Sequence, residues 1–212
     1  MKKIILLGGG RHCKVVIETL EEKAEYEIFG ISDLPEKMNT SILDYKIALL
    51  DKQLENYYPK IKYAFISLGK DLKLRERLFY YALNIGFNFP ILISPSANIS
   101  KYTKIGEGTL ITKNAVINVD TTIGKNCIIY SSAVLEHDCC IGNHTYISPS
   151  AAMAGNVKIG NTVFVGINAT IMPDVEIGDN SIIGAGSVII DDVPENVTVA
   201  GNPARIIKKG DK

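Results

Sequence analysis

The sequence predicts two folded parts: a small α/β domain with a parallel sheet over residues 1–90, and a parallel β-helix over residues 91–194. Residues 195–212 are expected to form a C-terminal tail. In the first part, strand-like and helix-like segments alternate, which is typical of a parallel sheet with crossover helices. In the second part a six-residue period repeats without interruption, and this period fits neither a helical face nor a long flat strand.

Six segments of the first part have strand or helix patterns, and they lie on either side of the turn Gly8-Gly9-Gly10. In chain order they are a strand at 2–7, a helix at 11–20, a strand at 26–31, a strand at 63–68, a helix at 71–83 and an extended segment at 89–93 that leads into the repeat. Residues 34–60 are expected to form a loop before a short strand.

The glycine turn between the first strand and the first helix predicts a phosphate cradle, because free backbone N–H groups and the helix dipole face such a turn. Cys13 stands where a dinucleotide fingerprint has its third glycine, so a mononucleotide diphosphate is the better fit. Asp33 ends the second strand, where a carboxylate can accept hydrogen bonds from a ribose or base. A plain tight turn and a solvated loop carboxylate remain the alternatives.

The second part carries one aliphatic residue in every hexad, seventeen times in succession: Ile93, Ile99, Ile105, Ile111, Ile117, Ile123, Ile129, Leu135, Ile141, Ile147, Met153, Ile159, Val165, Ile171, Ile177, Ile183 and Ile189. We interpret each hexad as one face of a triangular prism and three hexads as one coil, so that residue i stacks on residue i+18. The aliphatic residue and a small residue four places later face inward. Glycines and polar residues are expected to turn the corners, where glycine takes a positive φ freely.

The chain has three histidines, His12, His137 and His144. His12 follows the glycine turn and is placed to contact a phosphate or sugar. His137 has carboxylates on both sides, and a neighbouring carboxylate raises the basicity of an imidazole, which indicates a general base. The stacking rule places His137 over Gly155, which is expected to leave a slot for a ligand. His144 has weaker support, and an ordinary surface residue is the alternative for a histidine on a face of the prism.

Composition excludes several classes of protein. Lys and Arg together number 23, as do Asp and Glu, so the net charge is zero and nothing indicates a nucleic acid or an anionic membrane as partner. No apolar run is long enough for a membrane helix and no signal peptide is evident, so we expect a cytoplasmic protein. The four cysteines have neither a disulfide nor a zinc spacing, and Cys127 and Cys139 fall on the small inward position.

Three segments together with the repeat carry a resemblance to a known family. They are Glu136-His137-Asp138-Cys139, Ala154-Gly155-Asn156-Val157 and the C-terminal Ala200-Gly201-Asn202-Pro203-Ala204-Arg205. With the turn Gly8-Gly9-Gly10-Arg11-His12, the chain resembles over nearly its full length the hexapeptide-repeat family of bacterial sialic-acid O-acetyltransferases and nucleotide-aminosugar N-acetyltransferases. The resemblance implies a left-handed β-helix, a homotrimer with active sites between subunits, and acetyl-CoA as acyl donor with no metal.

The resemblance also implies roles for individual residues. The family's base falls on His137, and the acidic residue that raises its basicity falls on Asp138. The family's acetyl-CoA contacts fall on Gly155, Ile167 and Tyr146, where some relatives have a histidine. Its nucleotide-sugar contacts fall on a second set, which consists of Gly10, Arg11, His12, Ser32, Asp33 and Gly69.

The reaction that this implies is direct acetyl transfer to the amine of a UDP-, dTDP- or GDP-linked 4-amino-4,6-dideoxy sugar, in the synthesis of bacterial surface glycans. We expect His137 to accept the amine proton and a backbone N–H near Gly155 to bind the oxyanion. An O-acetyltransferase of a sialic-acid-type sugar and a non-catalytic nucleotide-sugar-binding trimer are the alternatives. A metal-dependent carbonic anhydrase is excluded, because it needs three histidine ligands per site.

Overall fold

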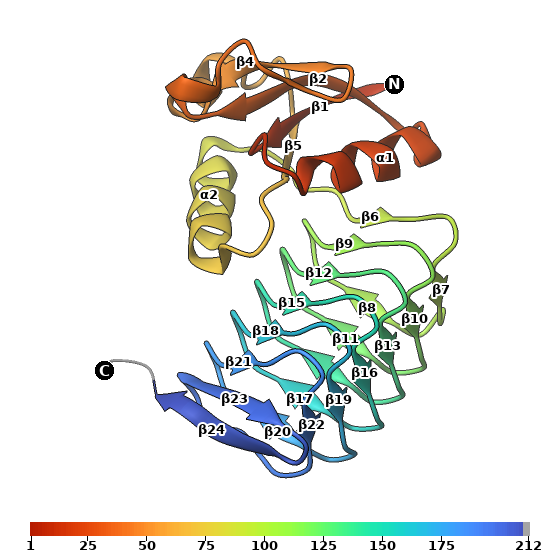
Figure 1. Cartoon of the computed structure of the whole chain (residues 1–212). Coiled ribbons are helices and arrows are strands. Elements are labelled where there is room, and N and C mark those ends of the chain that lie inside the picture. The colour runs from red at the N-terminus through yellow and green to blue at the C-terminus, as the bar shows by residue number, and fades with distance from the viewer. Residues whose placement is uncertain (210–212) are drawn as a thin grey trace. The chain divides into compact units, whose positions relative to one another are not determined.

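The computed structural model describes residues 1–209. The chain divides into two compact units, Met1–Leu92 and Ile93–Lys212. Figure 1 shows a sheet-and-helix unit and a parallel β-helix, so the predicted fold class is confirmed. No helix among the described residues is long and apolar enough to cross a membrane.

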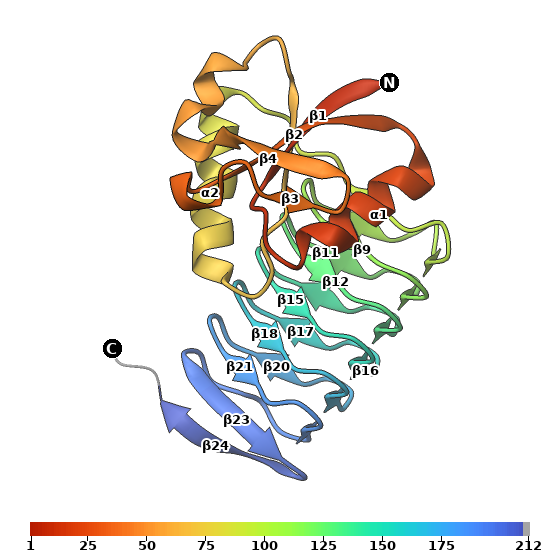
Figure 2. The ribbon, with the colours of Figure 1, turned by 45° about the horizontal axis from the view of Figure 1, so that its top comes forward.

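The N-terminal unit is built on a five-stranded sheet with the strand order β3-β4-β2-β1-β5. Its elements are β1 (Lys2–Leu7), α1 (Cys13–Lys23), β2 (Tyr26–Asp33), the 3-10 helix η1 (Pro35–Lys37), β3 (Ser41–Ile42), β4 (Tyr45–Leu50), the 3-10 helix η2 (Asp51–Asn56), β5 (Tyr63–Ile66) and α2 (Leu72–Ile85). β1 is parallel to β2 and to β5, which is labelled in Figure 1, and β2 is parallel to β4 (Figure 2). The carboxyl ends of these four strands therefore meet at one edge of the sheet, where ligands of α/β proteins bind.

Apolar side chains cover both faces of this sheet. Ile5 and Leu7 pack in one cluster with Phe79 and Ala82 of α2, while their neighbours on the opposite face are equally buried. The Asp71 carboxylate caps the start of α2 by accepting the Leu74 N–H at 3.0 Å, a bond that a free helix end lacks.

Residues 34–60 contain more regular structure than the sequence pattern predicts. Instead of a loop and one short strand they form the antiparallel hairpin β3–β4 and two 3-10 helices, and β4 pairs with β2 inside the sheet. Only Ile47 and Leu49 of β4 are buried, so its apolar alternation is short. The strand is fixed by pairing with a distant segment, which local periodicity does not register.

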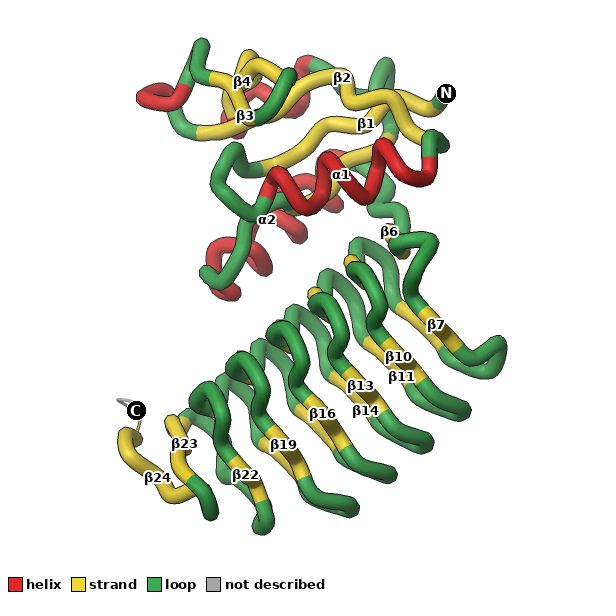
Figure 3. Tube along the Cα trace, turned by 45° about the vertical axis from the view of Figure 1, so that its right-hand side comes forward, coloured by secondary structure: helices red, strands yellow, loops and turns green. Residues whose placement is uncertain are grey.

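The second unit is a left-handed parallel β-helix with one two-residue strand for each predicted hexad. Its six-stranded sheet, drawn as parallel rungs in Figure 3, contains β7 (Asn98–Ile99), β10 (Val116–Ile117), β13 (Val134–Leu135), β16 (Ala152–Met153), β19 (Thr170–Ile171) and β22 (Val188–Ile189). Its five-stranded sheet contains β8 (Lys104–Ile105), β11 (Thr122–Ile123), β14 (Cys140–Ile141), β17 (Lys158–Ile159) and β20 (Glu176–Ile177).

The third face is an eight-stranded sheet. It contains β6 (Leu92–Ile93), β9 (Leu110–Ile111), β12 (Ile128–Ile129), β15 (Tyr146–Ile147), β18 (Phe164–Val165), β21 (Ile182–Ile183), β23 (Val197–Gly201) and β24 (Ala204–Lys209). β23 pairs with β21, and β24 folds back antiparallel to β23. Residues 197–209 of the expected tail thus form a hairpin that completes this sheet.

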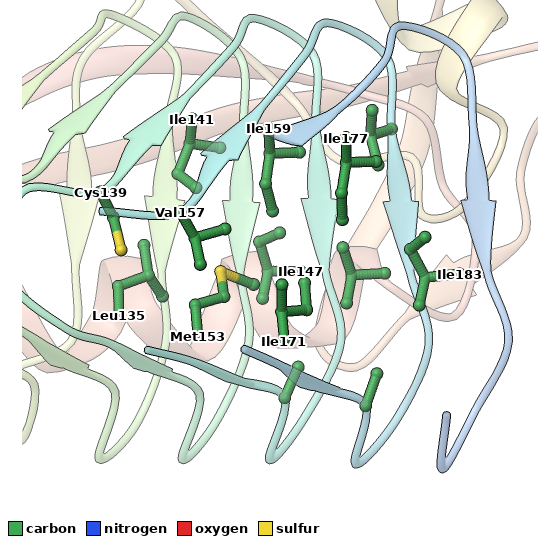
Figure 4. Close-up of a cluster of buried hydrophobic side chains, with 14 of the residues drawn as sticks. Leu135, Cys139, Ile141, Ile147, Met153, Val157, Ile159, Ile171, Ile177 and Ile183 are labelled. Atoms are coloured by element: carbon green, nitrogen blue, oxygen red, sulfur yellow. The ribbon is translucent and has the colours of Figure 1, made fainter. Parts of the chain in front are cut away.

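The interior of the prism is filled by the predicted aliphatic residues, one from each strand (Figure 4). From Ile111 to Ile189 each of these side chains is at most 4% exposed. Cys127 and Cys139 are also buried, as their hexad position predicts. Burial of one large aliphatic side chain per face is the main apolar contribution to the stability of this unit.

The corners are turned by polar residues rather than by the glycines that follow the aliphatic position. Left-handed φ values between 52° and 63° recur every six residues, at Asn114, Asp120, Asn126, Ser132, Asp138, His144, Ser150, Asn156, Thr162, Asn168, Asp174 and Asn180. Gly124 and Gly142 have no such φ. A Cβ on Gly142 would lie 2.5 Å from the carbonyl carbon of Gly160, so glycine is needed there because successive coils approach closely.

Candidate active site

His137 and Asp138 form a hydrogen-bonded pair at one corner of the β-helix. His137 Nδ1 lies 2.7 Å from Asp138 Oδ2, and both side chains are exposed. We call this corner, between the six-stranded and five-stranded sheets, the His137 corner; it comprises residues 118–121, 136–139, 154–157 and 172–175. A carboxylate only accepts, so Nδ1 carries the proton of this bond and Nε2 is the basic nitrogen.

The backbone beneath this pair is fixed by the neighbouring coils. The Asp138 N–H donates to the Val119 carbonyl at 3.0 Å, and the His137 carbonyl accepts the Asn156 N–H at 2.9 Å. Asp138 has a φ of +62°, which aspartate tolerates better than most residues. The coil geometry therefore turns the carboxylate back onto the preceding imidazole.

The hydrogen bond that Asp138 accepts from His137 raises the pKa of His137 above its ordinary value, and the negative charges of Asp138 and Glu136 add to this effect. Desolvation of the imidazole acts in the opposite direction, but the net shift of the His137 pKa is upward. The imidazole is therefore a stronger base than an isolated histidine, as proton abstraction near neutral pH requires.

Gly155 lies directly against the imidazole, but it does not leave the predicted slot for a ligand. A Cβ at this position would lie 2.5 Å from His137 Cε1 and 2.7 Å from Nε2. The ring itself occupies the space that the missing side chain leaves, so the prediction of an open slot beneath the ring is wrong. Glycine is needed here because the ring packs down onto the backbone of the next coil.

The N–H of Gly155 is available beside this ring. The flanking Ala154 and Asn156 donate their N–H groups to the Ile171 and His137 carbonyls of adjacent coils. Within residues 1–209 no hydrogen bond from the Gly155 N–H is present. A free backbone donor thus lies next to the basic nitrogen.

The other two predicted acetyl-CoA residues lie elsewhere on the prism. Tyr146 projects from β15 in the eight-stranded sheet, where its ring stacks on Phe164 with centroids 5.0 Å apart. Ile167 lies at the corner between the eight-stranded and six-stranded sheets and is 56% exposed. The β-helix of one chain therefore brings together His137, Asp138 and Gly155, but not Tyr146 and Ile167.

The second set of predicted residues lies at the carboxyl edge of the N-terminal sheet. Gly10 and the exposed Arg11 follow β1, and His12 directly precedes α1. A Cβ on Gly69 would be 3.4 Å from His12 Cβ, so the segments after β1 and β5 meet. Burial and the nearby Arg75 guanidinium lower the pKa of His12 to about 3, so this imidazole is neutral at physiological pH.

Ser32 and Asp33, at the end of β2, are both buried and both hydrogen-bonded within the chain. The Ser32 hydroxyl donates to the Asp51 carboxylate at 2.5 Å, and Asp33 Oδ2 accepts the Gly9 N–H at 2.7 Å. Asp33 also pairs with Lys37 at 2.9 Å. Asp51 and Lys37 are thus members of this edge that the sequence pattern missed, because they lie within residues 34–60, where β4 was not predicted.

The remaining histidine and the buried cysteine of this corner do not form a second candidate site. Within residues 1–209 no group of three or more His, Cys, Asp and Glu side chains is placed to hold a metal ion. His144 is buried, with Nδ1 2.9 Å from Asn126 Nδ2, away from the His137 corner. Cys139 Sγ donates to the Ala154 carbonyl, so this thiol belongs to the core.

Three family profiles match the chain. The profile described as PglD N-terminal domain matches residues 3–82. The bacterial transferase hexapeptide profile matches residues 120–155 and 156–191, and the hexapeptide repeat of succinyl-transferase matches residues 102–131. No curated protein sequence matches.

Solved structures match both units together. PerB from Caulobacter crescentus, solved with CoA and GDP-perosamine, is 34% identical over 97% of each chain, with a TM-score of 0.91. The acetyltransferase domain of PglB from Neisseria gonorrhoeae, solved with acetyl coenzyme A, is 29% identical over 97% of this chain and 99% of that one, with a TM-score of 0.90. WeeI from Acinetobacter baumannii is 25% identical over 98% and 100%, with a TM-score of 0.88.

Proposed function

The chain belongs to the hexapeptide-repeat acetyltransferases with a PglD-type N-terminal domain, and from this we propose that it transfers an acetyl group from acetyl-CoA to the amine of a nucleotide-linked 4-amino-4,6-dideoxy sugar. The pair His137–Asp138 beside the free N–H of Gly155 is the observation that carries the proposal. Bacterial surface glycans are the expected destination of the product. The similarity to PerB, a protein solved with CoA and GDP-perosamine, supports this acceptor class.

The proposed reaction is a direct transfer. The sugar amine attacks the thioester carbonyl carbon while His137 Nε2 accepts the amine proton, and Asp138 stabilises the resulting imidazolium. The Gly155 N–H donates to the oxyanion of the tetrahedral intermediate. The C–S bond then breaks, and the CoA thiolate leaves and takes up the proton held by the His137 imidazolium, which gives the free thiol and restores the base.

We propose further that the active site is formed between two subunits of a homotrimer. His137 and Gly155 lie at one corner of the prism, whereas Tyr146 and Ile167 lie on another face and another corner. If all four serve one acetyl-CoA, the first two belong to one subunit and the last two to its neighbour. At the N-terminal edge, Gly10, Arg11, His12, Ser32 and Gly69 are the proposed nucleotide-sugar residues, and Asp33 contributes by holding the glycine turn through the Gly9 N–H.

A thiol-release assay tests the proposed function. The wild-type protein is supplied with acetyl-CoA and, in turn, UDP-, dTDP- and GDP-linked 4-amino sugars and sialic acid. We expect turnover with one nucleotide-linked amino sugar and a loss of about 10²- to 10⁴-fold in kcat for His137→Ala at an unchanged melting temperature. Turnover with sialic acid alone would assign O-acetylation instead. Absence of turnover and of acetyl-CoA binding would favour a non-catalytic binding protein.

A further inference from the structure

The Asp33 carboxylate is engaged by its own chain. Oδ2 accepts the Gly9 N–H at 2.7 Å and the Lys37 ammonium at 2.9 Å, and Oδ1 accepts the Leu34 N–H at 2.8 Å. The side chain is only 6% exposed. These three bonds tie the glycine turn after β1 to the end of β2, so Asp33 shapes the phosphate cradle and has little capacity left for a ligand.

Asp51 is a second carboxylate at the same edge, and it is differently placed. It follows β4 directly and is half-buried, and its Oδ1 accepts the hydroxyl proton of the fully buried Ser32. No other hydrogen bond to this carboxylate is present within residues 1–209. The serine therefore fixes the orientation of the carboxylate while one oxygen stays available to an incoming donor.

The electrostatic environment of Asp51 favours pairing with a ligand donor. Burial raises the pKa of its carboxyl group, and the negative charge of Asp33 adds to this, while the Ser32 hydroxyl and the Lys37 ammonium act in the opposite direction. A partly desolvated carboxylate gains more from a hydrogen bond than a solvated one, because it has already lost water.

The strand order sets how far Asp51 lies from the phosphate cradle. β1 ends at the glycine turn, and β4 is two strands away across β2. Two strand spacings are about 10 Å. A nucleoside whose phosphates lie at the turn extends over a comparable length, with its ribose at the end of β2 and its base at the end of β4.

We propose that Asp51, rather than Asp33, is the carboxylate that recognises the nucleobase of the nucleotide sugar, by accepting a ring N–H of the base. This rests on the proposed function. Guanine, uracil and thymine carry a ring N–H on the Watson–Crick edge, whereas adenine and cytosine present a ring nitrogen with a lone pair there. Asp51 therefore favours the first three bases, because in the other two the ring nitrogen is an acceptor that faces the carboxylate and only the exocyclic amine can donate to it.

Calorimetric binding of UDP, dTDP, GDP, ADP and CDP to the full chain tests this assignment. For the wild type we expect at least one of the first three to bind about tenfold or more tightly than ADP and CDP. Loss of a hydrogen bond to a charged group in Asp51→Asn weakens that binding about 10- to 100-fold and removes the base preference. Asp44→Asn, an exposed carboxylate in the β3–β4 turn, is the matched control and leaves both unchanged.

The assignment is overturned if Asp51→Asn keeps the affinities and the base ranking, or if the wild type binds none of the five diphosphates. It is also overturned if Asp33→Asn loses base preference at an unchanged melting temperature while Asp51→Asn does not. Where turnover exists, Asp51→Asn raises KM for the nucleotide sugar and leaves KM for acetyl-CoA unchanged. If no amino sugar is acetylated, the proposed function fails, while the binding series still decides the role of Asp51.

Discussion

Gly155 in the β-helix and Gly10 in the N-terminal unit occupy comparable places in the two candidate binding regions, but the space beside them differs. A Cβ on Gly155 would lie 2.5 Å from the His137 ring, whereas a Cβ on Gly10 would have no atom within 4 Å. Neither residue has a left-handed φ. Glycine is needed at position 155 because the His137 ring fills the space beside it. At position 10 the N-terminal unit contains no atom that would clash with an added Cβ.

Glycine therefore has two different roles at these two candidate sites: it makes room for a side chain of the protein in one and leaves open space in the other. At the His137 corner, glycine lets the imidazole of the proposed base pack against the backbone, so this candidate site is organised by the chain itself. At the sheet edge, the open space beside Gly10 leaves room for the proposed approach of a phosphate to the backbone N–H groups. The two regions therefore respond differently when a methyl group is added, and substitution by alanine tests the comparison directly.

Gly155→Ala is expected to have the largest effect of these substitutions. The added methyl group pushes the His137 ring away from the Gly155 backbone, and a displacement of about 1 Å costs about 100-fold in rate. The ring is exposed and free to swing outward, so the melting temperature changes little. Steady-state thiol release and thermal denaturation measure the two quantities.

A second glycine of the same prism provides the control for this prediction. A Cβ on Gly142 would meet backbone atoms of the next coil at 2.5 Å, which cannot swing aside. Gly142→Ala should therefore lower the melting temperature. The kinetic effect of Gly155→Ala should vanish in a His137→Ala background, since the displaced ring is then absent. A loss of rate that persists in that background would contradict the role given to Gly155.

The sequence predicts which residues meet at the His137 corner better than it predicts those at the N-terminal sheet edge, and the reason is physical. In the β-helix each residue's face follows from its place in the hexad, so the juxtaposition of His137 and Gly155 could be deduced from their separation of eighteen residues. The register could not reveal that the ring fills the space over the glycine, because that depends on the side-chain rotamer. The sequence predicted glycines and polar residues at the corners, but it could not tell which of them take a left-handed φ: most are polar residues, Gly108 and Gly186 also do so, and Gly124 and Gly142 do not.

The N-terminal edge was harder to predict because its members come from the ends of four strands. The glycine turn and Asp33 follow strands with strong apolar patterns, and both were found. Asp51 follows β4, whose place in the sheet depends on pairing with β2. No local signal marks such a strand, so its carboxylate could not be placed beside Ser32 from the sequence alone.

Asp138→Asn is expected to have an intermediate effect. The hydrogen bond that Asp138 accepts from His137 raises the pKa of His137, and the base acts in its deprotonated form, so wild-type kcat/KM is expected to fall as the pH drops through that raised pKa. The variant loses the charge, the pKa of His137 falls back, and the acidic limb of the pH profile moves to lower pH. At a pH above the acidic limbs of both proteins, the variant is expected to be about tenfold slower than the wild type, because its imidazole is less basic.

Asp120→Asn is the matched control for this prediction. Asp120 occupies the equivalent left-handed corner position one coil earlier, with a φ of +55°, and asparagine tolerates such a φ as well as aspartate does. Its pH profile should match that of the wild type. An unshifted acidic limb in Asp138→Asn would show that the carboxylate does not control the titration of the base.

Gly10→Ala is expected to have the smallest effect, and one confined to ligand binding. The methyl group meets no protein atom within 4 Å, so folding is unaffected or stabilised by about 0.4 to 1 kcal/mol. The same group hinders a phosphate that approaches the turn, and KM for the nucleotide sugar rises several-fold at an unchanged KM for acetyl-CoA.

Gly9→Ala is the control for this prediction. Its Cβ would lie 2.2 Å from Ile47 Cδ1 in the buried core, which predicts a loss of about 1 to 3 kcal/mol in the free energy of unfolding. If Gly10→Ala leaves KM for the nucleotide sugar unchanged, the open space at this turn does not receive the phosphates, and the contrast between the two glycines fails.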